Sequence, residues 1–441
     1  MKRLAPLALI GLCAFVGLLF FSWNSGCAAT TKPLAIDTVS TSRIMPTDFE
    51  YLGAFRLPYI EQTDSSGLTI GWHWGGTGAT YYPGNNSLYI IGHDHTMYVS
   101  EVSIPVPVNS RNINDLNTAT TLRPFTNIRA GIVPLITLFE GEIHRGGLAY
   151  LSGKLYSCWG AHFQEGGQNL PPFAWCDLDF TNRQGAWRVN DDPLLYQSND
   201  YMFDVPSSFG NYVATGRFRD GGWGGNGPNL WLFAPWKAGN PPVNGTNLTG
   251  IRLLGYSSTA PEGFDFNGGH QINNFNTATD WSGGAWLTSG DKGAVIFVGT
   301  RGIGAAWYGF ANGTRYPIED PPEVDYPEVP AYPNNERGWW ATSFEAQVIL
   351  YDPADLARVA NGTRQPYEPQ PYASLSLNQF LYNQDKINHP NFQANRNKYL
   401  LGACAYDRTN RRLYIIEYRG EPAGQGFNDD NPIVHVFRIN P

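Results

Sequence analysis

Histidine and arginine side chains recur at comparable places along this chain. One set follows short apolar segments: His93, Asp94, His95, His162, Arg217, Arg219, Arg301 and Arg419. A second set stands in glycine-rich stretches: His73, Glu140, Glu142, His144, Arg145, Asp200, Glu262, Asp265, His270 and His389. Histidine serves as acid, base or metal ligand near neutral pH, and arginine clamps a carboxylate or sulfate through two parallel hydrogen bonds. These residue types indicate recognition of an anionic small group such as a sugar acid.

A repeated pattern of short strands positions these residues. Residues 79–82 are rich in β-formers, 83–86 have turn chemistry, 88–91 form an apolar run, and 98–104 alternate apolar with polar side chains. The pattern begins again at Gly146, Ser208, Gly283 and Leu401. Its period is on the order of 65 residues, which is typical of stacked β modules.

The two ends of the repeat region complement each other. Residues 49–57 predict a strand with no hairpin partner, while the last repeat supplies only three strands, at 402–407, 413–418 and 433–440. Pairing the first strand with these three would complete a four-stranded sheet and close a ring, which removes exposed strand edges. The arrangement resembles the β-propeller fold. We therefore predict an all-β chain with a single β-propeller of five four-stranded blades, six being the alternative, closed by the N-terminal strand.

The resemblance implies which loops share a face. The other four blades are predicted at residues 78–127, 147–189, 202–256 and 283–377. In a propeller, the loops joining second to third strands emerge on the same face as those joining one blade to the next. Seven of the eight histidines are therefore expected on this one face.

Composition excludes several classes of function. Aromatic residues are 14% and charged residues 15%, and 49 glycines with 32 prolines suit many short strands. A net charge of −8 argues against a general nucleic-acid binder. The glycine-rich residues 221–225 lack the lysine of a phosphate loop, and no GxSxG or HExxH motif occurs.

The first residues have the features of an export signal. Lys2 and Arg3 precede an apolar run to about Trp23, followed by small residues at 25–29. We predict a signal peptide at 1–28, with lipidation at Cys27 or a retained membrane helix as alternatives. A linker at 29–45 and the propeller at 46–441 would follow, so the protein is expected to be secreted or exposed at the cell surface. Membrane contact is expected only through such an anchor.

Two further features leave alternatives open. Cys158 and Cys176 fall on consecutive predicted strands, so a disulfide and a pair of buried thiols are equally compatible with the sequence. Residues 302–344 form a long insertion rich in aromatic side chains and proline. Loops of this length are usually functional or disordered, and the aromatic density argues against plain disorder. A lid or platform over one face is one hypothesis, and packing against a blade or subunit is the other.

The candidate site residues divide into two groups. His95, His144 and Glu142 are the candidate catalytic residues. The candidate substrate-binding residues are His73, His93, Asp94, His162, Arg219, Arg301 and Arg419. The alternative for each arginine is an ion pair with a neighbouring blade, and for each histidine a structural hydrogen bond in a turn. A divalent metal held by histidines with a carboxylate stays open, and no other cofactor is indicated.

Tryptophan, histidine and arginine side chains together predict that the binding partner is a carbohydrate. Tryptophans such as Trp72, Trp74, Trp159 and Trp223 offer surfaces for stacking on the apolar C–H faces of sugar rings. We predict a propeller that binds an acidic or decorated carbohydrate through a face rich in histidine and arginine. If it is an enzyme, it is a polysaccharide lyase or a glycoside hydrolase, with arginine neutralising a uronate or paired carboxylates acting as acid and nucleophile. The alternative is a non-catalytic glycan-binding, protein-binding or structural surface protein.

Overall fold

The computed structural model describes most of the chain beyond the leader. The described residues are 42–63, 67, 69–94, 96–132, 143–144, 146–161, 171–189, 199–217, 226–235, 242–256, 270–317, 325–331, 334–335, 337–382, 400–421 and 431–441. The chain divides into Met1–Pro33 and Leu34–Pro441, and all described residues belong to the second unit. The predicted signal peptide and Cys27 lie outside the described residues. Among those described, no helix combines the length and apolar character needed to cross a membrane.

Three antiparallel sheets form the first three blades. The first blade contains β5 (Ala79–Tyr82), β6 (Ser87–Ile91), β7 (Val99–Ser103) and β8 (Thr121–Thr126). The second contains β10 (Leu148–Leu151), β11 (Lys154–Cys158), β13 (Phe173–Asp177) and β14 (Gln184–Val189), with β18 (Asn247–Leu248) added in parallel at its edge. The third contains β15 (Tyr201–Asp204), β16 (Val213–Gly216), β17 (Leu230–Phe233) and β19 (Gly250–Leu254). Each blade is an up-and-down sheet in sequence order, as the repeat predicted.

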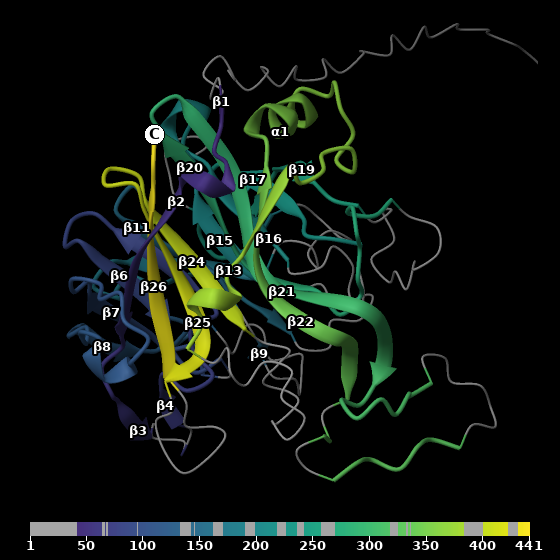
Figure 1. The fold of residues 1–441 in the computed structure, drawn as a ribbon. Helices are drawn as coiled ribbons and strands as arrows, with labels where there is room; N and C mark the ends of the chain where they lie inside the picture. Colours follow the sequence, from purple (N-terminus) through teal and green to yellow (C-terminus); the bar gives the residue numbers. More distant parts are fainter. Residues whose placement is uncertain are drawn as a thin grey trace, which may run out of the picture. The chain divides into compact units, whose positions relative to one another are not determined.

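The last two blades bring the two ends of the described chain into the ring. The fourth contains β20 (Asp280–Ser289), β21 (Lys292–Gly309), β22 (Gly338–Tyr351) and β23 (Ala373–Ser376), and β1 (Ser42–Arg43) pairs in parallel with β21. The fifth has the order β2 (Phe49–Arg56), β26 (Asn431–Ile439), β25 (Arg412–Glu421) and β24 (Leu401–Asp407). Figure 1 shows purple β2 beside yellow β26. The predicted closure by the N-terminal strand is confirmed.

Short elements lie in the connections between blades and between strands of one blade. They are β3 (Glu61–Thr63), β4 (Thr69–Gly71), β9 (Ile143–His144), β12 (Gly160–Ala161), the helix α1 (Pro353–Ala360) and the 3-10 turns Pro46–Asp48, Ile113–Asp115, Ser207–Phe209 and Asn378–Phe380. Helix α1 begins at Pro353, where the Asp352 side chain accepts a hydrogen bond from Ala354 N and so caps the helix. It packs against β19. Helical structure is therefore a minor addition to a β ring.

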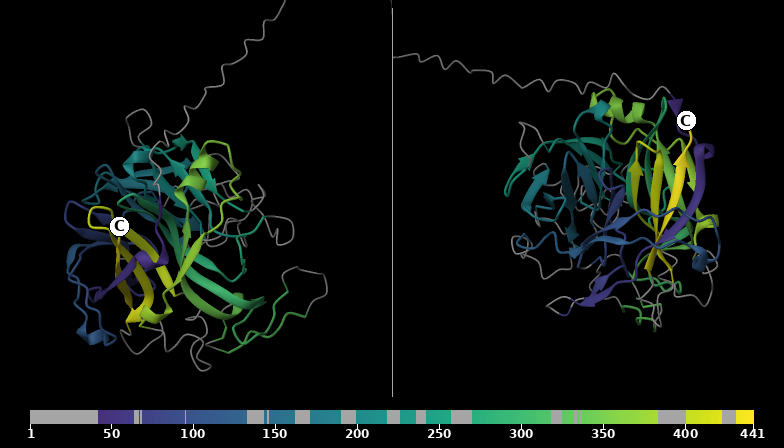
Figure 2. Two further views of the ribbon diagram at one scale, coloured as in Figure 1. Left: turned by 45° about the horizontal axis from the view of Figure 1, so that its top comes forward. Right: turned by 90° about the vertical axis from the view of Figure 1, so that its left-hand side faces the viewer.

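The innermost strands close the ring. Strands β5, β10, β15, β20 and β24 contact one another in cyclic order, and Figure 2 shows the blades side by side in two further views. Each of the five junctions between neighbouring blades contains an apolar cluster of buried side chains. Glycine at the start of an inner strand permits the close approach: a Cβ on Gly147 would lie 2.2 Å from the Met202 backbone nitrogen of the next blade. The all-β, five-bladed propeller is thus the fold of this chain.

The cysteines are thiols rather than a disulfide. Cys158 lies opposite Phe173, while Cys176 lies opposite Leu155. Since Cys158 and Leu155 are separated by an odd number of residues along one strand, the two sulfurs project from opposite faces of the sheet. Both cysteines are buried and free. The disulfide alternative is wrong because side-chain alternation separates the pair.

The long insertion continues the blade as a strand pair. Strands β21 and β22 remain paired from Gly302 opposite Phe344 to Gly309 opposite Gly338, and Figure 1 shows both running on beyond their neighbours. A bulge at Gly304, where φ is +80°, adds one residue to β21. We call residues 302–309 with 338–344 the ribbon. Both ends of the predicted insertion at 302–344 are therefore regular β structure.

Candidate functional site

Two groups of polar side chains stand out on the face that carries the loops between second and third strands. One lies where the fifth blade meets the first and comprises His73, Trp74, His93, Asp94 and Arg419; we call it the junction cluster. The other is a pocket between the third and fourth blades. The topology of consecutive antiparallel strands places both groups at the same end of the strands, which we call the loop face.

Backbone hydrogen bonds hold the junction cluster in place. The segment between β4 and β5 is tied to the segment after β6, since His93 N donates to Gly71 O at 2.9 Å and Gly76 N donates to Ile91 O at 2.8 Å. Ala403 N of the fifth blade donates to Gly76 O at 2.8 Å. The residues between Gly71 and Gly76 are thus fixed between two blades.

Two histidines and an aspartate meet there. The rings of His73 and His93 are 4.9 Å apart between centroids and nearly perpendicular, at 81°. His93 Nδ1 lies 3.4 Å from Asp94 Oδ1, and the side chains of His93 and Asp94 are 16% and 9% exposed. A partly buried imidazole beside a carboxylate is an arrangement that can hold or transfer a proton.

An arginine and a tryptophan complete the cluster. The Arg419 guanidinium carbon lies 3.8 Å from the centre of the Trp74 ring, within the range of a cation–π interaction. Both residues have left-handed backbones, with φ of 53° and 58°. This conformation costs a non-glycine residue about 1–2 kcal/mol. Such strain concentrates at binding and catalytic sites, so the pair supports a functional role for the cluster.

Arg129 is a buried cation that the sequence analysis missed. Its Nη2 donates to Thr96 O at 2.6 Å in the loop after β6, and the side chain is 5% exposed. Burial lowers the pKa of Arg129 to about 10. Its Nε and Nη1 have no hydrogen-bond partner among the residues that the structure describes. A lone basic residue within the apolar stretch from Ile128 to Ile132 was the available signal.

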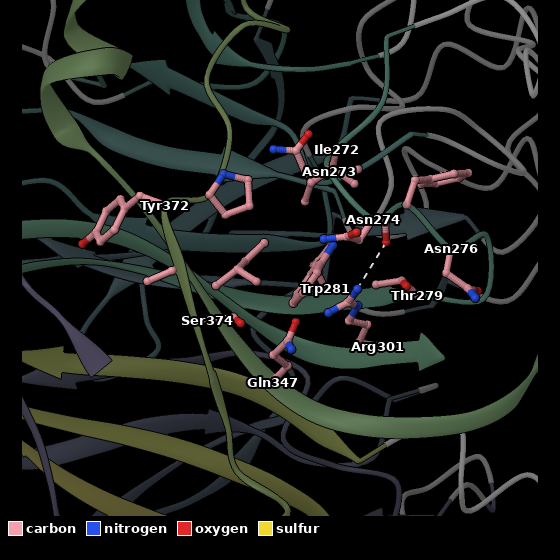
Figure 3. A pocket seen from close by; sticks show the side chains of 15 residues that line it. Ile272, Asn273, Asn274, Asn276, Thr279, Trp281, Arg301, Gln347, Tyr372 and Ser374 are labelled. Carbon is pink, nitrogen blue, oxygen red and sulfur yellow. Dashed lines mark hydrogen bonds between the residues drawn. The ribbon is translucent and has the colours of Figure 1, made fainter. Parts of the chain in front are cut away.

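The pocket has a volume of about 210 Å³ and contains neutral polar groups around one cation. Its lining residues are Gly227, Ile272, Asn273, Asn274, Phe275, Asn276, Thr279, Trp281, Arg301, Gln347, Ile349, Pro371, Tyr372, Ala373 and Ser374. Figure 3 shows Arg301 near Trp281 and Gln347, with Asn274 and Thr279 beside it. Amide and hydroxyl groups thus line a pocket with an aromatic wall.

The pocket walls are fixed by hydrogen bonds to three parts of the fold. The bonds run from Ile272 N to Asn226 O (2.8 Å), from Asn273 N to Gln370 Oε1 (2.8 Å), from Gln370 Nε2 to Gln271 O (3.1 Å) and from Asn276 Nδ2 to Gly304 O (3.0 Å). They connect the loop before β20 to the third blade, to the segment before β23 and to the ribbon. The pocket is therefore formed before any ligand arrives, as binding sites for small molecules usually are.

Arg301 is the sole charged residue among the fifteen that line the pocket. Its Nη2 lies 3.5 Å from Asn274 O, and it forms no ion pair with a described carboxylate. Glu345, its cross-strand neighbour, instead accepts a hydrogen bond from Gln347 Nε2 at 3.1 Å. The pocket can therefore offer a guanidinium to an anion together with amide and hydroxyl groups to neutral oxygens.

The predicted site residues are partly brought together. His93 contacts both His73 and Asp94, and Arg419 stacks on Trp74, while Arg301 lies in the separate pocket. The backbone of His144 pairs with Gly160. The other predicted residues, His95, Glu142, His162 and Arg219, lie outside the described residues, so the catalytic assignment stays a prediction.

Two alternatives considered in the sequence concern structural ion pairs of arginines and a bound metal. Arg217 Nε lies 3.7 Å from Asp200 Oδ2 with both side chains buried, which is the structural ion pair considered for arginines after second strands. Across the part of the chain that the structure describes, no three His, Cys, Asp or Glu side chains gather as metal ligands would. The neutral pocket residues belong to no sequence motif, so only the fold could reveal them.

Comparison with known proteins adds little on function. No protein-family model and no curated protein matches the sequence. Among solved structures, a luciferin-regenerating enzyme matches with a TM-score of 0.29 at 8% identity, covering 86% of this chain and 95% of that one. A mannose phosphorylase from Leishmania mexicana gives 0.30 at 8% identity over 90% and 89%, and a glucose dehydrogenase 0.26 at 11% over 86% and 90%. These likenesses are too distant to bear on what this chain binds.

Proposed function

We propose that this chain is an exported β-propeller that binds an acidic carbohydrate in the pocket around Arg301. The observation that carries the proposal is the chemistry of the lining: one guanidinium, several amides and hydroxyls, and no carboxylate among the fifteen residues. A phosphate-binding or nucleic-acid site would call for more positive charge. A purely apolar ligand would make no use of the exposed amides of Asn273 and Asn274.

Each part of a sugar acid has a counterpart in the pocket. The carboxylate would accept charge-assisted hydrogen bonds from Arg301, which suits bidentate geometry. The sugar hydroxyls would bond to Asn273, Asn276 and Thr279, and the apolar ring face would lie against Trp281. A volume of about 210 Å³ is below the roughly 300–1,000 Å³ typical of pockets for drug-sized ligands, so we expect one sugar ring here.

The pocket favours binding over catalysis at that position. No histidine, aspartate or glutamate is among its lining residues, so it supplies no general base for elimination and no carboxylate pair for hydrolysis. If the chain is an enzyme, proton transfer would come from outside the pocket, and among the described residues the junction cluster supplies a histidine beside a carboxylate in His93 and Asp94. Export is supported by the charged and apolar leader at residues 1–28.

A glycan screen tests the proposal. Protein beginning at Ser42 would be incubated with neutral, uronic and sulfated polysaccharides, and binding, ultraviolet absorbance and reducing ends would be measured with and without a chelator. We expect binding to uronic glycans. Absorbance from an unsaturated sugar would add lyase activity, and reducing ends alone would add hydrolysis. Binding to neutral glycans only, or to none, would contradict the proposal.

A further inference from the structure

We infer that the acidic carbohydrate is a polymer, with one ring in the pocket and the following rings on one face of the ribbon. The inference rests on the proposed function and adds the length and path of the ligand. It is drawn from the continuity between the pocket and the ribbon. The two share strands, hydrogen bonds and a side-chain face.

The ribbon begins at the edge of the pocket. Arg301 is the last residue of β21 before the ribbon, and Gly302 N donates to Thr279 Oγ1 of the pocket at 3.2 Å. The bulged residue Gly304 accepts the hydrogen bond from Asn276 Nδ2 at 3.0 Å. A ligand leaving the pocket past Asn276 therefore meets the ribbon directly.

One face of the ribbon continues the pocket wall. Gln347 and Ile349 of β22 line the pocket. Residues separated by an even number along a strand share a face, so Ser343, Ala341 and Trp339 lie on the same side as Gln347. Tyr308 is paired with Trp339 across the ribbon and shares that side. Trp340 and Phe344 on the opposite side are buried in the core. Ala341 belongs to the same core and Trp339 packs against it, so the first side is accessible only in part.

Small residues separate the pocket from an aromatic patch. Ser343 on β22 and Ala306 on β21 are small, half-buried residues that leave a low surface on this face, and Ala341 between them is buried. Beyond it, Tyr308 contacts Trp339, with ring centroids 5.5 Å apart. The seven residues from Glu345 to Trp339 span about 20 Å of extended strand, a length that accommodates several sugar rings. The order of pocket, low surface and aromatic patch describes a path for a chain.

The aromatic patch is continuous and half-exposed. Tyr308 and Tyr316 are 6.2 Å apart between ring centroids, and Tyr316 stacks on Tyr326 at 5.1 Å. Tyr326 is 49% exposed. The Arg337 guanidinium lies 4.4 Å from the centre of the Tyr316 ring. We call Tyr308, Tyr316, Tyr326 and Trp339 the aromatic patch.

The ribbon contains no charged residue, which separates its contribution from that of the pocket. The stretch between its two strands, residues 310–337, has six acidic residues and two arginines in sequence. The patch therefore contributes stacking area, whereas Arg301 contributes charge. Salt should weaken binding to the pocket and leave the ribbon's contribution to chain-length dependence nearly unchanged.

A chain-length series tests the inference. Affinity would be measured by calorimetry for galacturonic and glucuronic acid from the monosaccharide to the hexasaccharide, with the original protein, Tyr308→Ala, Trp339→Ala and the control Tyr59→Ala, an exposed tyrosine outside the ribbon. We expect affinity to rise with length. Each ribbon variant should lose roughly tenfold or more for the hexasaccharide and less than about twofold for the monosaccharide, since tenfold corresponds to the loss of one substantial contact.

The outcomes separate this inference from the proposed function. If the monosaccharide binds but longer chains bind no better, the polymer path is overturned while the pocket survives. Equal losses for monosaccharide and hexasaccharide in Tyr308→Ala would also overturn it, because the ribbon would then act through the fold. If no uronic sugar of any length binds, both proposals fail. Trp339→Phe retains an aromatic ring and should recover most of the affinity for the hexasaccharide.

Discussion

At the scale of single residues, the sharpest stability test is a buried histidine–glutamate pair in the fifth blade. His435 Nε2 lies 2.8 Å from Glu417 Oε2, with both side chains at most 2% exposed, and the Tyr51 hydroxyl lies 3.0 Å from His435 Nδ1. Removing one partner of a buried pair leaves an uncompensated group, so Glu417→Ala should lower the free energy of unfolding by about 3–5 kcal/mol. Urea denaturation would measure this.

An exposed pair on the same blade supplies the control. Arg438 Nη1 lies 3.5 Å from Glu50 Oε2, and both side chains are more than 40% exposed. Surface pairs contribute about 0–1 kcal/mol, so Glu50→Ala should change the free energy of unfolding little. Equal effects of the two substitutions would show that the buried network does not stabilise the blade.

The cysteines give a second test at this scale. Burial raises the pKa of the Cys176 thiol to about 12 and raises the pKa values of Cys158 and Cys404 further. Because the thiolate is the reactive form, iodoacetamide at pH 8 should leave all three unmodified in folded protein beginning at Ser42. Mass spectrometry should find three modified thiols in denaturant. A non-reduced sample with only one modifiable thiol would indicate the disulfide after all.

Individual residues were the least predictable part of the site. The sequence placed His73, His93 and Asp94 on one face because strand order determines where loops emerge. It could not place Arg419 on Trp74, since that contact depends on two left-handed backbones. The asparagines of the pocket carry no motif, and their role follows only from the loop geometry before β20.

At the scale of elements, β2 determines whether the ring closes. Phe55 is fully buried between the fifth and first blades. Phe55→Ala should lower the free energy of unfolding by about 3–5 kcal/mol, because it removes the aromatic ring and leaves a cavity. Val106 is 75% exposed, so Val106→Ala should stay within about 0.5 kcal/mol.

Deletion gives the stronger form of this test. Protein lacking residues 42–58 loses β1 and β2, and with them the outer strand of the fifth blade. We expect loss of the cooperative thermal transition in circular dichroism. A deletion variant that melts cooperatively at nearly the original temperature would show that closure by β2 is dispensable.

Strands of the blades were predictable, whereas the ribbon was not. Short apolar runs between turn residues predicted the second strand of each blade, because a strand covered by a neighbouring blade on each side needs apolar side chains on both faces. In the ribbon, the bulge at Gly304 shifts the alternation by one residue, so residues 302–309 show no period of two. The same stretch therefore looked like a loop in sequence and is a strand in the fold.

At the scale of the whole molecule, the many buried tyrosines predict sensitivity to alkali. Burial raises the pKa of Tyr81 to about 12 and also raises the pKa values of Tyr89, Tyr156, Tyr372, Tyr406 and Tyr414. Above pH 10 the unfolded chain loses these protons while the folded chain keeps them. Stability should therefore be full below pH 9 and fall as pH rises above 10, by about 1.4 kcal/mol per pH unit for each such proton.

One group opposes this trend. The pKa of Arg129 is lowered to about 10, so above that pH the folded chain loses the Arg129 proton before the unfolded chain does. Taken by itself, this residue therefore stabilises the fold as pH rises above 10. Six tyrosines outweigh one arginine, and the net direction is destabilisation. Urea denaturation at pH 8, 9, 10 and 11 would measure it, and a free energy of unfolding that stays constant would contradict the burial of the tyrosines.

The ring as a whole was predictable because its pattern of short strands repeats along the sequence. The first predicted strand has no hairpin partner, and the last repeat supplies only three strands. Pairing the first strand with the last repeat completes that blade and closes the ring. The pocket was not predictable, because it forms where loops of two blades and the segment before β23 meet. Sequence periodicity identifies the blades and carries no information on the shape of the spaces between them.

The most direct test of the central claim compares a uronic acid with its neutral parent sugar. Calorimetry would measure both with the original protein, Arg301→Gln and the exposed control Arg438→Gln. We predict tighter binding of the uronic acid, and a roughly 10- to 150-fold loss in Arg301→Gln that abolishes the preference, as expected for hydrogen bonds to a charged group. Arg438→Gln should behave like the original. A preference for the uronic acid that survives in Arg301→Gln would contradict the account.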